Sequence, residues 1–547
     1  MFRELAGARV CEEITQLIYS APHDTLVYPA DNRLMSITQG AVRLNGTYIG
    51  VPATLANLQA LRRYEFPIVA PMEKDGYDYP IRAPWSPLPH QRVTSNFLVL
   101  HTRCFCFNDM GTMKTLSALW AADYLMRQAE AKGETFRALV VAPLSTLQSV
   151  WGDAIWRHFI GRRRAVILHG SAVKRQKLLK ESADFYIVNH DGLGVGVSSN
   201  RKQALEGLAA DLDARRDIRL AIVDEAAVYR DATTKRHMVA RRLIGARDYL
   251  WFMTGTPTPN GPLDAYGLAK LVNNANGESF RSYQERTMLR VGPFKLVPKI
   301  TAVRAATELL QPAIRYAIET CVDLPPCTVQ KRDAELSPPQ HAAYKRLQRD
   351  CVLAMQSGKL VHAVNEAALR MKLIQIACGA IYDTDHETHV IDAGPRLQIL
   401  KEVIAECREK IIIFAPLTSV VDMLYQTLCK EYECAVIKGA VEQNDRAKIF
   451  RDFQYQKAPR IIVADPGTVA HGLTLTAASA VIWYAPTDKT ELYLQANKRI
   501  DRPGQTKSTN IIQIAATPVE REIYKRLENN QNMMGIILKM VEEGKLK

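Results

Sequence analysis

Three groups of residues in this chain of 547 residues have types and spacings suited to phosphate chemistry. The first is Asn108–Thr115 (NDMGTMKT), a loop of the type G-x-x-x-x-G-K-[ST] in which Asn108 and Met113 stand in place of the two glycines. Lys114 would place a charge on the terminal phosphates of a nucleotide, and the Thr115 hydroxyl would bind magnesium. On its own this loop is weak evidence, because a Gly followed by Lys-Thr at this spacing occurs by chance in roughly one chain in ten of this length.

The second group is Asp224-Glu225, at the end of the apolar run 220–223. Two adjacent carboxylates at the carboxyl edge of a strand can hold Mg²⁺ and activate an attacking water. The third is Arg499 and Arg502, which share one face if their segment is helical and can bind phosphate oxygens as permanent cations. Taken singly, solvated loop acids and a basic helix face making ion pairs are the ordinary alternatives.

The elements that must position these groups follow a strand-then-helix rhythm. Apolar, strand-like runs alternate with helical patterns in two series, and this alternation predicts parallel sheets in an α/β fold. The runs of the first series are 103–107, 138–142, 165–168, 185–188 and 220–223, and those of the second are 411–414, 435–437, 461–464, 481–483 and 511–514.

These series predict two α/β halves joined by a middle region with a largely helical pattern. The first 80 residues differ, with short strand-like pieces and few helix signals, and we expect a small accessory domain there. The predicted divisions are 1–80 for the accessory domain, 81–261 for the first half, 262–390 for the helical region and 391–547 for the second half.

The composition limits the class of protein. A formal net charge of +14 and a pI near 9.2 favour a polyanionic partner such as nucleic acid. The ten cysteines include no C-x-x-C pair or zinc spacing, which favours a reducing intracellular compartment. The N-terminus lacks a signal-peptide pattern, and no apolar run reaches the ~18 residues of a membrane span. We therefore expect a soluble, cytoplasmic protein with no membrane partner.

Taken in order, four segments of the first half resemble the motifs of superfamily-two helicases. They are Asn108–Thr115, Ala142–Ser145 (APLS), Asp224–Ala227 (DEAA) and Thr254–Pro257 (TGTP), and they look most like the Swi/Snf-type ATPases and their compact bacterial and phage relatives. The resemblance continues through the second half, where Gln495–Gln505 (QANKRIDRPGQ) meets every fixed position of the family pattern Q-A-x-x-R-x-x-R-x-G-Q. It covers about residues 85–547 and implies two tandem RecA-like lobes.

The resemblance also implies roles for individual residues, with ATP and Mg²⁺ as cofactors. The residues implied in catalysis, with Arg499 and Arg502 as arginine fingers, are Lys114, Asp224, Glu225, Arg499 and Arg502. Those implied in nucleotide binding are Gln91, Asp109, Met110, Gly111, Thr112, Met113, Lys114, Thr115, Gly472 and Gln495, with Thr115 and Asp224 on the metal. Those implied in nucleic-acid binding are Pro143, Leu144, Ser145, Thr254, Gly255, Lys438, Gly439 and Thr468.

Four positions depart from the family pattern. Asn108 stands where Asp is usual, Met113 where the family has Gly, Ala227 where it often has His, and Thr474 where it has Asn. Met113 is strained if the loop needs a positive φ there, and is tolerated if the backbone is already helical. All the charged groups that the chemistry needs are present, which favours an active site.

The leading hypothesis is a DNA-dependent ATPase that translocates on double-stranded DNA through sequence-tolerant backbone contacts. A strand-separating or branch-processing helicase is the first alternative. A nucleotide-gated DNA-binding clamp that does not hydrolyse ATP is the second, and Met113 and Ala227 are its best support. The N-terminal region is a candidate site for a protein partner, and the compact form of the matched motifs favours a bacterial or phage-infected host cell.

Overall fold

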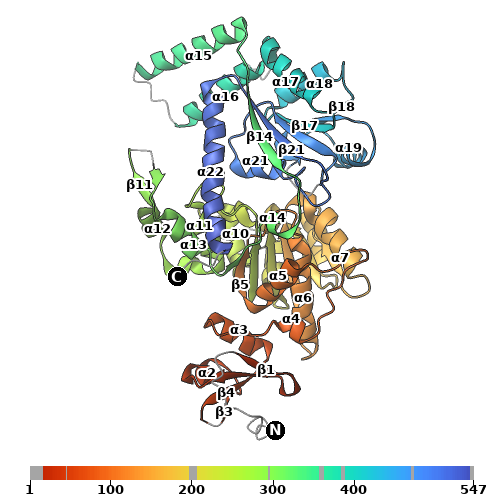
Figure 1. Cartoon of the computed structure of the whole chain (residues 1–547), viewed down its shortest axis with the longest axis vertical. Coiled ribbons are helices and arrows are strands. Elements are labelled where there is room, and N and C mark those ends of the chain that lie inside the picture. The colour runs from red at the N-terminus through yellow and green to blue at the C-terminus, as the bar shows by residue number, and fades with distance from the viewer. Residues whose placement is uncertain are drawn as a thin grey trace.

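The computed structural model describes residues 17–44, 46–195, 206–292, 296–356, 363–382, 388–469 and 474–542. Figure 1 shows a small N-terminal sheet at the bottom, a first α/β lobe in the middle and a second α/β lobe at the top. The long C-terminal helix runs between the two lobes. Among the described residues, no helix is long and apolar enough to cross a membrane.

The N-terminal part is an antiparallel sheet of order β1-β2-β4-β3. Its own small core contains Leu26, Leu34, Ile49 and Leu58, which are fully buried. Its elements are β1 (Ile18–Ser20), η1 (Ala21–His23), β2 (Thr25–Pro29), α2 (Asn32–Ile37), β3 (Val42–Leu44), β4 (Tyr48–Pro52), α3 (Leu55–Arg63) and α4 (Pro71–Lys74). The strand-like pieces that the sequence predicted here are therefore strands.

The first lobe is a seven-stranded parallel sheet of order β13-β5-β10-β9-β6-β8-β7. Separate apolar clusters cover its two faces, which explains why its strands read as continuous apolar runs. Its elements are α5 (Pro89–Leu100), β5 (Arg103–Cys106), α6 (Lys114–Glu130), β6 (Arg137–Ala142), η2 (Leu144–Thr146), η3 (Leu147–Gly152), α7 (Asp153–His158), β7 (Ala165–Ile167), α8 (Ala172–Leu179), β8 (Phe185–Asn189), η4 (His190–Gly194), α9 (Gly207–Ala214), β9 (Ile218–Asp224), η5 (Ala226–Tyr229), α10 (Lys235–Leu243) and β10 (Tyr249–Met253).

The range 262–390 is rich in helices but also contributes strands to both lobes. β13 joins the edge of the first sheet, and β14 pairs with β21 at the edge of the second. Nearly all of β14 is exposed, so it lacks the apolar run by which the other strands were predicted. The elements are α11 (Asp264–Val272), η6 (Asn274–Gly277), α12 (Phe280–Thr287), β11 (Met288–Arg290), β12 (Leu296–Pro298), α13 (Ala302–Leu309), β13 (Ala313–Ile314), α14 (Ile318–Cys321), β14 (Cys327–Asp333), α15 (Pro338–Gln356), α16 (Ala363–Cys378), β15 (Ala380–Tyr382) and β16 (Thr388–Val390).

The second lobe is a six-stranded parallel sheet of order β14-β21-β20-β17-β19-β18 around one apolar core. The prediction of an α/β fold with two parallel sheets is thus confirmed, whereas the division boundaries stay a prediction. The elements are α17 (Gly394–Glu406), β17 (Lys410–Phe414), α18 (Thr418–Leu428), β18 (Cys434–Ile437), α19 (Gln443–Tyr455), β19 (Ile461–Ala464), α20 (Pro466–Val469), β20 (Ala478–Trp483), α21 (Thr490–Asn497), β21 (Thr509–Ala515) and α22 (Pro518–Glu542).

Helix α22 belongs to both lobes. Near its start, Ile523 and Leu527 lie in the core of the second lobe, whereas Ile537 and Val541 near its end lie in the core of the first. The end of α22 packs on α13, as Figure 1 shows. The helix therefore ties the lobes together by apolar packing.

This packing predicts a large difference between two neighbouring isoleucines of α22. Ile537→Ala should lower the stability of the first lobe by about 2–4 kcal/mol, because it leaves a cavity in the contact with α13. Ile536 is 53% exposed on the same helix, so Ile536→Ala is the matched control and should change stability little. Calorimetric unfolding of both variants checks this, and equal melting temperatures would contradict the packing.

Candidate nucleotide site between the two lobes

The predicted phosphate loop connects β5 to the start of α6. Lys114 is the first residue of α6 and is nearly buried, and its Nζ lies 3.4 Å from the carbonyl oxygen of Asn108. The first amide groups of α6 face the loop, and a helix N-terminus with a lysine beside it is a favourable place for phosphate oxygens. Thr115, the second residue of α6, lies at the same end.

Met113 precedes α6 with a left-handed backbone, φ 56° and ψ 35°. The conformation that the missing glycine would supply is therefore retained, although a side chain there costs roughly 1–2 kcal/mol. The tolerated helical alternative is wrong for this residue. Met113 holds a strained position in the loop, as residues of functional sites often do.

Replacing Met113 by glycine should relieve this strain. We expect Met113→Gly to be about 1 kcal/mol more stable than Met113→Ala, because both remove the long side chain and only glycine adopts a positive φ freely. We also expect Met113→Gly to bind ATP more tightly without changing DNA dependence. Thermal unfolding measures the stability, and titration with a fluorescent ATP analogue measures the affinity for ATP. If the natural chain did not hydrolyse ATP and Met113→Gly did, the natural protein would be a non-hydrolysing clamp.

Helix α5 lies beside the loop and brings Gln91 toward it. Gln91 is buried, and its Oε1 accepts a hydrogen bond of 2.9 Å from the Leu88 amide. The imidazole of His90 is hydrogen-bonded to the carbonyl oxygen of Thr112 at 3.1 Å, which joins α5 to the loop. Within the described part of the chain, the buried Nε2 of Gln91 and Oδ1 of Asn108 have no hydrogen-bond partner. Such orphaned polar atoms beside a phosphate loop fit a nucleotide.

The side chain of Asp109 contacts the segment that joins the lobes. Its carboxylate pairs with the guanidinium of Arg315 at 2.7 Å and accepts a hydrogen bond of 3.1 Å from the Ile318 amide. The carboxylate is thus held by the segment that joins the lobes, and the binding of a nucleotide by Asp109 stays a prediction.

The predicted pair of carboxylates lies at the carboxyl end of β9, a central strand of the first sheet. Asp224 is buried and accepts a hydrogen bond of 3.1 Å from Nε1 of Trp151, a residue that sequence reasoning missed. Burial, and then the neighbouring charge of Glu225, raise the pKa of Asp224 to about 6, while Lys114 opposes this rise. Glu225 has φ 50° and ψ 49°, so it too is strained.

Residues of the second lobe meet this pair across the space between the lobes. Nε2 of Gln495 lies 3.3 Å from Oε2 of Glu225. A Cβ built on Gly111 would lie 3.0 Å from Cδ of Pro503, so the phosphate loop and the segment after α21 also touch. The lobes are therefore closed on one another at the site.

Arg499 and Arg502 lie on the same side as Gln495. Burial lowers the pKa of both side chains, that of Arg502 to about 10, while the charge of Glu225 opposes the effect in each case. Arg502 also lowers the pKa of Arg499, so the two cations and Glu225 lie within electrostatic reach of one another. Two neighbouring buried cations destabilise one another, and a phosphate bound between them would stabilise both charges.

The segment of the two arginines is not helical, so the condition for a shared helix face is not met. Helix α21 ends at Asn497, and both follow it in a turn. Other segments hold the chain after the helix. The backbone amide of Leu475 donates a hydrogen bond to the carbonyl oxygen of Arg499, and Nε2 of Gln505 donates one to the carbonyl oxygen of Ile500. The guanidinium of Arg502 returns to Lys498 and donates to its carbonyl oxygen at 2.9 Å.

The donor set suits magnesium held partly by phosphate. Thr115 at the start of α6 and Asp224 at the end of β9 offer a hydroxyl and a carboxylate oxygen. No group of three or more His, Cys, Asp or Glu side chains that fits a metal occurs in the described ranges. Mg²⁺ usually keeps waters and substrate phosphates as ligands, so one carboxylate and one hydroxyl suffice.

The residues expected to bind nucleic acid divide into two groups. Leu144 and Ser145 are exposed after β6, and Lys438, Gly439 and Thr468 are partly or fully exposed at the ends of β18 and β19. The exposed residues therefore lie at the carboxyl edges of both sheets. Lys438 forms an ion pair of 2.6 Å with Asp422.

Two other expectations have different outcomes. Thr254 is fully buried, and a Cβ on Gly255 would lie 3.6 Å from the Met110 amide nitrogen, so this pair packs against the phosphate loop. Both residues are buried, and their contact with nucleic acid stays a prediction. Gly472 lies outside the described residues.

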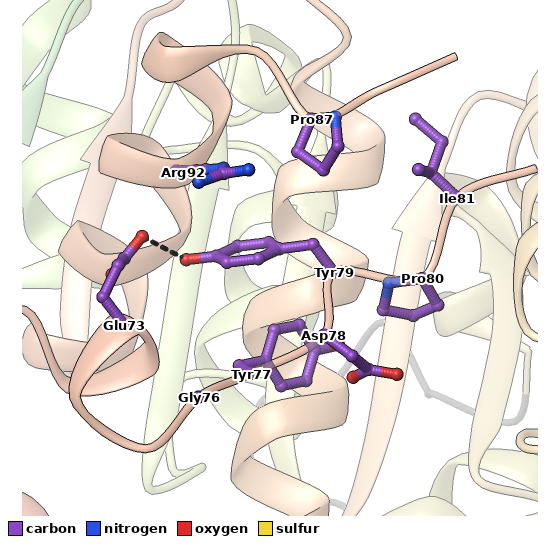
Figure 2. A pocket seen from close by; sticks show the side chains of 9 residues that line it. All are labelled: Glu73, Gly76, Tyr77, Asp78, Tyr79, Pro80, Ile81, Pro87 and Arg92. Carbon is purple, nitrogen blue, oxygen red and sulfur yellow. Dashed lines mark hydrogen bonds between the residues drawn. The ribbon is translucent and has the colours of Figure 1, made fainter. Parts of the chain in front are cut away.

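A cavity of about 510 Å³ lies beside α5, and Figure 2 shows Tyr79 crossing it between Glu73 and Pro80. The Tyr79 hydroxyl donates to Glu73, and the guanidinium of Arg92 lies 5.2 Å from the ring centre of Tyr79. No residue of the phosphate loop lines this cavity. We therefore do not assign it to the nucleotide phosphates.

Comparison with known proteins gives family matches to both halves of the chain. The SNF2-related domain matches residues 90–378, and the helicase conserved C-terminal domain matches residues 395–504. Putative protein p41 of Acyrthosiphon pisum secondary endosymbiont phage 1 is 24% identical over 83% of this chain and 98% of its own length. Human SWI/SNF-related matrix-associated actin-dependent regulator of chromatin subfamily A member 1 is 23% identical over 80% of this chain, and human DNA repair and recombination protein RAD54-like is 22% identical over 82%.

The chain spans 42% and 66% of the length of these two human proteins. Among solved structures, the Sulfolobus solfataricus SWI2/SNF2 ATPase core in complex with dsDNA is 20% identical, with a TM-score of 0.37, over 84% of this chain and 94% of that chain. The SNF2-related match alone covers more than half of the 547 residues, and it contains the phosphate loop and both carboxylates. The chain therefore belongs to the SNF2-related family of helicase-like ATPases.

Proposed function

We propose that the protein is a DNA-dependent ATPase that hydrolyses ATP between its lobes and moves along double-stranded DNA. The observation that carries this proposal is the meeting of Lys114, Asp224 and Glu225 of the first lobe with Arg499 and Arg502 of the second. These are the charges that phosphoryl transfer needs, and they come from two bodies able to open and close.

Each residue of the site has a distinct task. Lys114 and the N-terminus of α6 would hold the terminal phosphates of ATP. Thr115 and Asp224 would bind the metal, and Gln91 would contact the base. Mg²⁺ held by Thr115 and Asp224 would neutralise part of the charge on the phosphoryl group of ATP. Glu225 accepts a proton from the attacking water, and Arg499 and Arg502 stabilise the charge that develops on the phosphate oxygens.

The grip on DNA would come from the carboxyl edges of both sheets. We expect both lobes to contact the DNA backbone. The first lobe would do so through Pro143–Ser145, and the second through Lys438–Gly439 and Thr468. With a net charge of +14, binding should be sequence-tolerant and should weaken steeply with salt.

Rates of ATP hydrolysis with single-stranded, duplex and forked DNA test the proposal. We expect duplex DNA to stimulate hydrolysis most, and we expect ATP-driven displacement of a third strand from a triplex without separation of the duplex. Displacement of a strand from a fork would favour the helicase alternative. DNA binding with no phosphate release on any DNA would favour the non-hydrolysing clamp, which the strain at Met113 supports.

A further inference from the structure

Helix α21 contacts the turn that carries Glu225 at two points. The turn is η5 (Ala226–Tyr229), with Glu225 before it and Arg230 after it. Gln495 of α21 reaches Glu225 at 3.3 Å, and Glu491, one helical turn earlier, reaches Arg230 at 2.9 Å. Because residues four apart lie on the same helix face, one face of α21 holds both ends of η5.

Arg230 joins three elements at this point. Its Nη1 donates to Oε2 of Glu491 and, at 3.0 Å, to the carbonyl oxygen of Ala227, and its Nε lies 4.0 Å from Asp264 of α11. The side chain of Glu491 is only 18% exposed, so solvent screens this pair weakly. The ion pair therefore ties the second lobe directly to the backbone of η5.

Helix α11 supports η5 from the side of the first lobe. A Cβ on Gly267 of α11 would lie 2.0 Å from the carbonyl oxygen of Arg230, so the helix and the end of the turn pack backbone to backbone. The turn thus rests on α11 and is held from the other lobe by α21. Glu225 at its start has a strained backbone, which persists only where neighbours over-determine it.

We propose that the Arg230–Glu491 pair is an interlobe latch that holds η5, and with it Glu225, in the orientation for hydrolysis when the lobes close. Both are positioning residues, because neither touches the reacting atoms and each acts through η5 and Glu225. This inference rests on the proposed function. Opening of the lobes separates α21 from η5 and releases Glu225, so hydrolysis is coupled to closure.

The test compares Glu491→Gln and Arg230→Gln with the natural chain in DNA-stimulated ATP hydrolysis. At pH 8 Glu491 is charged, since burial and the charge of Glu225 raise its pKa only to about 7 while Arg230 opposes them. We expect kcat to fall about tenfold in each variant, with KM for ATP within about twofold and duplex binding unchanged, as for loss of a coupling contact. Arg230→Lys should restore most of the kcat.

The control is Asp488→Asn. Asp488 precedes α21 and pairs with Arg526 inside the second lobe, so its loss removes an ion pair of the same region without touching η5. Its kcat should match that of the natural chain. The double variant with Glu491→Gln and Arg230→Gln should be no slower than either single variant, because both remove the same contact.

A second measurement separates this inference from the proposed function. Fluorescence transfer between dyes on cysteines placed at the exposed Val173 and Tyr455, one on each lobe, reports closure with a non-hydrolysable ATP analogue, after the accessible native cysteines are replaced. Glu491→Gln should lower the closed fraction. Unchanged kcat and closure in an active protein would overturn the latch, whereas a natural chain inactive on every DNA would overturn the proposed function.

Discussion

Glu225→Gln should abolish measurable ATP hydrolysis and leave duplex binding intact. The substitution keeps the shape of the side chain and an oxygen that can accept the hydrogen bond from Gln495, so the fold and the closure of the lobes are retained. It removes the carboxylate that takes the proton from water, and loss of such a base costs about 10²–10⁴ in rate. Phosphate release with saturating duplex DNA measures the rate, and fluorescence anisotropy measures DNA binding.

Glu522→Gln is the matched control, because Glu522 is an exposed carboxylate on α22 far from the site. Its rate should equal that of the natural chain. Turnover by Glu225→Gln within tenfold of the natural rate would show that another group activates the water. A parallel loss of DNA binding would show that Glu225 supports the closed lobes instead.

Arg502→Ala should reduce hydrolysis by about 10³–10⁵, the range for loss of an arginine that stabilises phosphoryl transfer. Burial lowers the pKa of Arg502 to about 10, yet the group stays charged at neutral pH, so the site retains a cation there. Within the described residues, its side chain donates hydrogen bonds to the carbonyl oxygen of Lys498 and, at 3.3 Å, to the hydroxyl of Thr474. Removing the side chain therefore breaks few hydrogen bonds.

Single-turnover measurement of phosphate release separates the chemical step from product release for Arg502→Ala. Arg521→Ala is the control, since Arg521 is an exposed arginine of the same lobe that pairs with Asp333. We expect nucleotide binding by Arg502→Ala to fall much less than its rate. A loss of ATP affinity equal to the loss of rate would place Arg502 in binding the ground state.

The strands and the chemistry at their ends were predictable because both have local signals. Each strand predicted in the two lobes is a continuous apolar run, as a sheet covered on both faces requires, and Asp224 follows such a run directly. The exposed strand β14 has no such run, and the sequence therefore placed it within a helical region. Trp151 and Glu491 have no local signal either, since an indole or a carboxylate on a helix is ordinary until its partner is known.

By itself, the sequence determined the order of the motifs, the two parallel sheets and the charges available to a nucleotide. Only the tertiary structure decided how those charges meet. Gln495 and Glu225 are separated by 270 positions and touch because the lobes close, and α22 contributes to both cores because it spans them. The burial of a strand or helix can be predicted from the pattern of apolar residues along it. Contacts between the lobes and the positive φ of Met113 depend instead on how distant segments pack.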